Sequence, residues 1–148
     1  MDVDDEHIAR ACAHTMLADD TTFRSLGFAL EEVGPGRARV AGTVTEMMAN
    51  GHGICHGGMI FTLADCAFAY ACNSYNQRAV AQVCAITFLA PARIGDRLTA
   101  VAREQHRGAR NGVYDITVTD QHGTVIAEFR GNSRVVSGDW LSDSKDKD

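Results

Sequence analysis

A nearly unbroken apolar run lies near the middle of the chain, from Met59 to Ser74. Its sixteen residues contain no proline and are enough for about four turns of α-helix. Only Thr62 and Asp65 interrupt the run before Asn73. Because a carboxylate is costly to bury without compensation, Asp65 is the unusual residue of this predicted helix.

Helical periodicity divides the run into two faces. Residues seven apart lie on nearly the same side, so Gly58, Asp65 and Cys72 align, with Thr62 and Ala69 beside them. Bulkier apolar residues lie on the opposite side: Ile60, Leu63, Ala67 and Tyr70. We expect the bulky face to pack against a sheet and the small face to approach another backbone closely.

The rest of the chain has the pattern of one short helix and several β-strands. The helix is expected from about Asp4 to Leu17, and Asp19–Thr22 is expected to be a break. Strands are expected at Phe28–Val33, Ala38–Thr45, Ala79–Leu89, Arg97–His106, Val113–Thr119 and Val125–Val136. This order predicts an α+β fold in which an antiparallel sheet wraps around the central helix.

The predicted strand Ala79–Leu89 is apolar on both faces. Such a strand is expected either in the middle of a sheet or in a subunit interface. The second possibility predicts a homo-oligomer, either a dimer or a dimer of dimers.

Length and composition predict one domain at residues 21–136, with a helical segment at 1–20 and a charged, disordered tail at 137–148. The net charge of −5 and the lack of a basic stripe argue against a nucleic-acid partner. No signal peptide is expected, and the apolar run is too short and interrupted for a membrane span. Five cysteines without a Cys-x-x-Cys pair indicate reduced thiols and a cytoplasmic protein.

The element order and the centre of the chain together resemble the hotdog fold, and more specifically the acyl-CoA thioesterases of phenylacetic acid degradation. The resemblance rests on Asn50-Gly-His-x-x-Cys-His-Gly-Gly58, Leu63-Ala-Asp65 and the run from Ala67 to Ser74. It extends to Phe88-Leu-x-Pro91, Gly95-Asp96, Gly112-Val-Tyr-Asp-Ile116 and Phe129-Arg-Gly131. It covers roughly Phe23 to Val136.

The resemblance implies hydrolysis of a small aromatic acyl-CoA, of phenylacetyl or hydroxyphenylacetyl type, with no cofactor beyond the coenzyme A of the substrate. It implies that Asp65 is the catalytic carboxylate, that Gly57 provides the oxyanion-binding amide, and that Asn50 and His56 are their neighbours. Substrate contacts are expected from Gly58, Phe61 and Thr62.

The residues alone leave several roles open. Asp65 could attack the thioester, could act as general base for water, or could be a structural residue bonded to Thr62 or to backbone. Asn50 could form a turn instead of a site, and His56 could fix its loop by hydrogen bonding. An acyl-CoA hydratase and a non-catalytic acyl-CoA-binding or structural dimer are the alternative functions.

Two further candidate sites are weak. His52, Cys55 and His56 are zinc-ligand types, but the surrounding glycines disfavour the helix that their spacing requires, so we expect no metal. The arginines that could reach coenzyme A phosphates or simply be solvated are Arg110, Arg130 and Arg134.

The distance between the two principal candidates leads to a prediction about assembly. Asp65 lies eight residues beyond Gly57, which is about 12 Å along a helix at ~1.5 Å per residue. An attacking group and an oxyanion donor must both lie within about 3 Å of one carbonyl group. If both residues are catalytic, the site is shared between two subunits.

Overall fold

The computed structural model describes residues 3–141. Its helices are α1 (Val3–Asp19), α2 (Thr21–Ser25), the 3-10 turn η1 (Glu46–Met48) and α3 (Gly57–Cys72). Its strands are β1 (Ala29–Gly34), β2 (Arg37–Thr43), β3 (Ala79–Phe88), β4 (Arg97–Arg107), β5 (Asn111–Thr119) and β6 (Val125–Val135). Both predicted helices and all the predicted strands are present, and α2 and η1 were not predicted.

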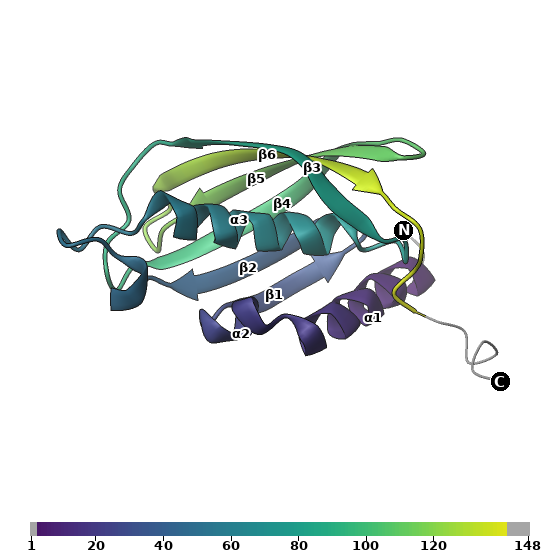
Figure 1. Ribbon diagram of the computed structural model, residues 1–148, viewed down its shortest axis with the longest axis horizontal. Helices are drawn as coiled ribbons and strands as arrows, with labels where there is room; N and C mark the ends of the chain where they lie inside the picture. Colours follow the sequence, from purple (N-terminus) through teal and green to yellow (C-terminus); the bar gives the residue numbers. More distant parts are fainter. Residues whose placement is uncertain (1–2, 142–148) are drawn as a thin grey trace.

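All six strands form one antiparallel sheet in the order β1-β2-β4-β5-β6-β3. Figure 1 shows α3 lying across this sheet, with α1 and α2 beside β1. The sheet around one long helix confirms the predicted hotdog fold.

The bulky face of α3 forms the core, as its periodicity predicted. Ile60, Leu63, Ala67 and Tyr70 are each at most 3% exposed. They belong to the same core cluster as inward-facing strand residues, among them Val40, Ala100 and Ile116. Each large aliphatic side chain buried in this way contributes about 1.5–3 kcal/mol relative to remaining exposed.

Strand β3 is an edge strand that pairs only with β6. The prediction that it could be central in the sheet is therefore wrong for a single chain. Several of its apolar side chains, and the one that follows it, are about half exposed: Val80, Val83, Phe88 and Leu89. An apolar pattern indicates that a strand is buried, but it does not indicate whether the same chain or a second subunit buries it. The subunit interface therefore stays a prediction.

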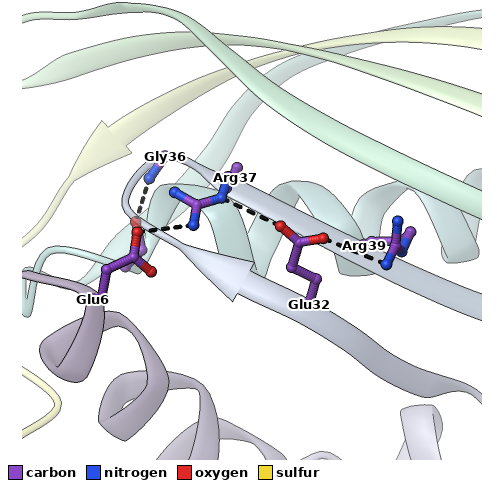
Figure 2. A network of polar contacts seen from close by, with 6 residues as sticks. Glu6, Glu32, Gly36, Arg37 and Arg39 are labelled. Carbon is purple, nitrogen blue, oxygen red and sulfur yellow. Dashed lines mark hydrogen bonds and ion pairs between the residues drawn. The ribbon is translucent and has the colours of Figure 1, made fainter. Parts of the chain in front are cut away.

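The N-terminal segment is part of the same body and not a separate unit. Cys12 of α1 is fully buried, and Glu6 accepts a hydrogen bond at 2.8 Å from the Arg37 guanidinium of β2. Figure 2 shows Arg37 between Glu6 and Glu32, with Arg39 on the far side of Glu32. The Glu6–Arg37 ion pair fastens α1 to the β1–β2 hairpin, and the other two ion pairs lie within that hairpin.

Of the predicted break Asp19–Thr22, only Asp20 lies outside a helix, between α1 and α2. Asp20 is the N-cap of α2, and its carboxylate accepts a hydrogen bond from the Phe23 amide at 3.1 Å. Aspartate is a favoured N-cap because it satisfies an amide that has no partner within the helix. A run of two acids and two threonines predicts a break, but it does not indicate that a short helix begins within it.

The prediction of a disordered tail from residue 137 is wrong for the part up to residue 141. Trp140 donates from its indole nitrogen to the Asn73 side chain at 2.8 Å, and the Arg78 guanidinium lies 4.2 Å from its ring centre. The Asn76 side-chain oxygen accepts from the amides of Trp140 and Leu141. The number of charged residues in the tail does not indicate these specific contacts. The rest of the predicted tail, 142–148, lies outside the described residues.

Two further features concern the cysteine thiols and the helices. All five cysteines are free thiols, and three of them are buried. Within residues 3–141 there is no helix that is both long enough and apolar enough to cross a membrane.

Candidate active site

The first turn of α3 is held between two backbone segments. His56 is the N-cap residue, and its amide donates to the Met48 carbonyl at 2.8 Å. The Cys55 amide donates to the Ala92 carbonyl, also at 2.8 Å. The amides of Gly57 and Gly58 donate no hydrogen bond within the described chain. These free donors stand at the positive end of the helix dipole, where an anionic oxygen is favoured.

A groove of about 520 Å³ borders this helix end. Its lining is Ile54, Cys55, Gly57, Ile60, Phe88, Leu89, Ala90, Pro91 and Ala92. Burial raises the pKa of the Cys55 thiol, which disfavours the thiolate needed for nucleophilic attack. The groove therefore offers an apolar wall and backbone donors, but its lining contains no acid or base suited to attack a thioester.

The loop before the helix places Asn50 and His56 at the surface. The Asn50 side-chain oxygen accepts hydrogen bonds from the amides of His52 at 2.9 Å and Ile54 at 3.1 Å, which is the turn-forming role considered above. The His56 ring makes no hydrogen bond with the described residues, so its backbone and not its imidazole fixes the loop. That Asn50 and His56 belong to the active site stays a prediction.

The three predicted substrate contacts differ in their surroundings. Gly58 is exposed, with open space where a Cβ would lie. Thr62 donates its hydroxyl to the Gly58 carbonyl at 2.8 Å. Phe61 packs edge to face on Phe129 at 5.1 Å between ring centres. Thr62 and Phe61 thus have local packing or hydrogen-bonding roles that do not depend on a substrate.

Asp65 is partly buried on α3. Its pKa is raised, first by burial and then by repulsion from the Asp20 carboxylate. Its carboxylate accepts no hydrogen bond from the described residues, and the Thr62 hydroxyl bonds to Gly58 instead. The structural alternative for Asp65, a bond to Thr62 or to backbone, therefore has no support here.

Gly57 and Asp65 occupy one continuous helix. Eight residues at ~1.5 Å each separate them by about 12 Å along its axis. Asp65 is also absent from the lining of the groove that Gly57 borders. In a single chain the structure does not bring these two predicted site residues together.

Two residues near the site had no role in the sequence-based hypothesis. Phe88 ends β3 and lines the groove beside Gly57. Asp20, between α1 and α2, accepts a hydrogen bond from the Tyr70 hydroxyl at 3.2 Å and repels the charge of Asp65. The partners of both residues are distant in the sequence, and the periodicity of a single helix or strand does not predict such contacts.

The weaker candidates are not assembled at the groove. Arg130 forms a two-point ion pair with Asp115, at 2.7 and 2.8 Å, and neither Arg110 nor Arg134 lines the groove. Among residues 3–141, no three His, Cys, Asp or Glu side chains are placed to hold one metal ion. That no metal takes part stays a prediction, and full activity after exhaustive chelation would support it.

The raised pKa of Asp65 predicts a pH dependence. If the carboxylate must be ionised to act, kcat/KM falls as the pH drops through its pKa, and this acid limb lies above the ordinary carboxyl value of 3.8. Asp20→Asn removes the second cause of the shift while keeping a capping oxygen, so the limb should move to lower pH. Asp19→Asn, at an exposed neighbouring position, is the matched control. A limb that stays in place in Asp20→Asn would show that Asp20 does not tune Asp65.

Comparison with known proteins agrees with the fold. The sequence model of the thioesterase superfamily matches residues 52–127. The acyl-coenzyme A thioesterase PaaI of Escherichia coli is 47% identical over 132 residues, covering 89% of this chain and 94% of that protein. A solved structure of E. coli PaaI, from the phenylacetic acid degradation operon, superimposes with a TM-score of 0.89 at 46% identity, covering 90% of this chain and 97% of that one. A Streptococcus mutans protein solved with bound acetyl CoA has a TM-score of 0.73 at 29% identity, covering 76% of this chain and 90% of that one.

The chain therefore belongs to the thioesterase superfamily, and the prediction that it is a thioesterase is confirmed. Within that superfamily its resemblance to the phenylacetic acid degradation proteins is confirmed by its similarity to E. coli PaaI along most of both chains.

Proposed function

We propose that this enzyme hydrolyses the thioester of a small aromatic acyl-CoA, releasing the free acid and coenzyme A. The E. coli relative is an acyl-coenzyme A thioesterase whose gene lies in the phenylacetic acid degradation operon, and the S. mutans relative binds acetyl CoA. The apolar groove at the free amide of Gly57 supports the proposal, because it can take an uncharged thioester arm and still offer donors to its carbonyl oxygen.

The active site we propose is shared between two copies of the chain. The observation that carries this proposal is the separation of Gly57 from Asp65 on one helix, together with a groove lining that contains no carboxylate. The exposed apolar edge of β3 supports pairing with a second copy, since an unpaired edge of this kind favours association. The choice between a dimer and a dimer of dimers stays open in this prediction.

The chemistry needs one carboxylate and one oxyanion site. The Asp65 carboxylate of one copy attacks the thioester carbonyl carbon, or takes a proton from a water that does so. The Gly57 amide of the other copy donates a hydrogen bond to the oxygen that becomes negative. The carbon–sulfur bond then breaks and coenzyme A leaves as its thiolate. If Asp65 itself attacked, water cleaves the resulting anhydride and restores the carboxylate.

Product analysis with a panel of acyl-CoA substrates tests this function. We expect free thiol from every substrate that is turned over, with the highest kcat/KM for phenylacetyl-CoA or hydroxyphenylacetyl-CoA. A preference for aliphatic acyl groups would reject the proposed substrate class alone. A hydrated acyl chain with the thioester intact would indicate a hydratase, and binding without any product would indicate an acyl-CoA-binding protein.

A further inference from the structure

The last residue of β3, Phe88, is held firmly by its backbone while its side chain stays open to solvent. It pairs with Ala127 of β6, and the next two amides, of Leu89 and Ala90, both donate to the Ile126 carbonyl at 2.8 and 3.3 Å. The Phe88 side chain is nevertheless 49% exposed and forms part of the groove wall. An exposed aromatic ring on a fixed backbone is a surface suited to contact a ligand.

The outer end of one face of this ring lies against Gly57. A Cβ atom added to Gly57 would lie 2.8 Å from Cζ of Phe88 and 3.1 and 3.2 Å from the two Cε atoms. Gly57 does not have a positive φ angle, so its backbone conformation is open to other residues. A larger residue at this position would therefore have to displace the exposed Phe88 ring. At the next position, Gly58, no atom lies within 4 Å of such a Cβ.

We propose that Phe88 is a substrate-positioning residue, whose ring holds the thioester carbonyl against the Gly57 amide and keeps water from one side of it. This inference rests on the proposed thioesterase function. A hydrogen bond to a developing oxyanion is stronger where water is excluded, because the local dielectric is lower. The ring can exclude water only while it lies against Gly57. The positioning role of Phe88 therefore also depends on the lack of a side chain at Gly57.

The competing explanation is that Phe88 only helps to cover the edge of β3. Val80, Val83 and Leu89 are exposed to a similar degree, at 50%, 58% and 57%. Phe88 differs from Val80 and Val83 in lining the groove, and its ring atoms lie nearer than any atom of Leu89 to the position that a Cβ of Gly57 would take. A role confined to edge packing would be shared among these side chains, whereas positioning of the thioester would be particular to Phe88.

A double-mutant cycle between Gly57→Ala and Phe88→Ala tests the positioning role. Gly57→Ala keeps the backbone N–H and pushes the ring away; Phe88→Ala removes the ring. With phenylacetyl-CoA we expect each single variant to lower kcat about 10-fold, as a small misplacement of reacting groups does, and KM to change less. The double variant should be no slower than the slower single variant, because both substitutions remove one contact. Phe88→Tyr, which keeps the ring, should retain most of the activity.

Controls separate positioning from folding and assembly. Each variant is examined for thermal stability and for mass in solution, beside Val80→Ala as a second shortened side chain of β3. Losses that multiply in the double variant would overturn the inference, as would a loss in Phe88→Ala that follows a change in mass and is matched by Val80→Ala. Failure of the parent enzyme to release thiol would instead reject the proposed function, and the positioning role with it.

Discussion

Asp65→Asn is expected to lower kcat by at least ~10², as expected for loss of a nucleophile or general base. The substitution keeps the shape of the side chain and removes its charge. Since Asp65 accepts no hydrogen bond from the described residues, the amide breaks no internal bond when it replaces the carboxylate. Release of free thiol from an aromatic acyl-CoA measures the effect. Activity within a few-fold of the parent would return Asp65 to a structural role.

The stability of Asp65→Asn provides an independent check on this interpretation. The pKa of Asp65 is higher in the folded chain than the ordinary value, mainly because burial disfavours the charged form. A carboxyl group with a raised pKa favours folding at low pH, and that contribution is lost as the pH rises above the unfolded-state pKa. At pH 7 the charge therefore disfavours folding, so Tm of Asp65→Asn should equal or exceed that of the parent. A sharp fall in Tm would mean that the carboxylate has structural partners.

The order of the elements could be predicted from the sequence because each element carries its own local signal. The presence of α3 and its buried face follow from spacing alone, since Ile60, Leu63, Ala67 and Tyr70 recur at helical intervals. The helix begins and ends two residues before the apolar run does. The antiparallel pairing of β1 with β2, of β4 with β5 and of β5 with β6 follows from the short turns that join them, whereas the pairings of β2 with β4 and of β6 with β3 do not. The position of β3 at the sheet edge did not follow, because its apolar pattern fits a covered strand of either kind.

The candidate site was predictable only in part. Gly57 stands out in the sequence because it belongs to a glycine-rich stretch directly before an apolar helix. Asp65 stands out because it is the one carboxylate within that helix. The contact of Phe88 with Gly57 joins residues 31 positions apart, and the effect of Asp20 on Asp65 spans 45 positions. Such contacts depend on how the sheet and helices pack, and no local pattern encodes them. The same holds for Trp140, whose partner Asn73 lies at the end of α3.

The shared site predicts that two inactive variants restore activity when they are mixed. One is Asp65→Asn. The other is Gly57→Pro, which removes the amide proposed to bind the oxyanion. Gly57 is the first residue of α3, where proline is well tolerated, and His56 before it has the extended conformation, φ −60° and ψ 138°, that a following proline requires. The proline also meets the Phe88 ring, but that disturbance falls on a site which is already inactive.

Each variant alone should be nearly inactive. After unfolding and refolding together in equal amounts, about half of the dimers should contain one chain of each kind, by random pairing in a two-fold assembly. Each mixed dimer has one site with both lesions and one with an intact Asp65 and an intact Gly57 from different chains. Activity should therefore recover to roughly a quarter of the parent value. Both variants must fold and exchange subunits, which mass measurement on differently tagged chains establishes. If they exchange and the mixture stays inactive, Asp65 and Gly57 do not meet across an interface, and the shared site is wrong.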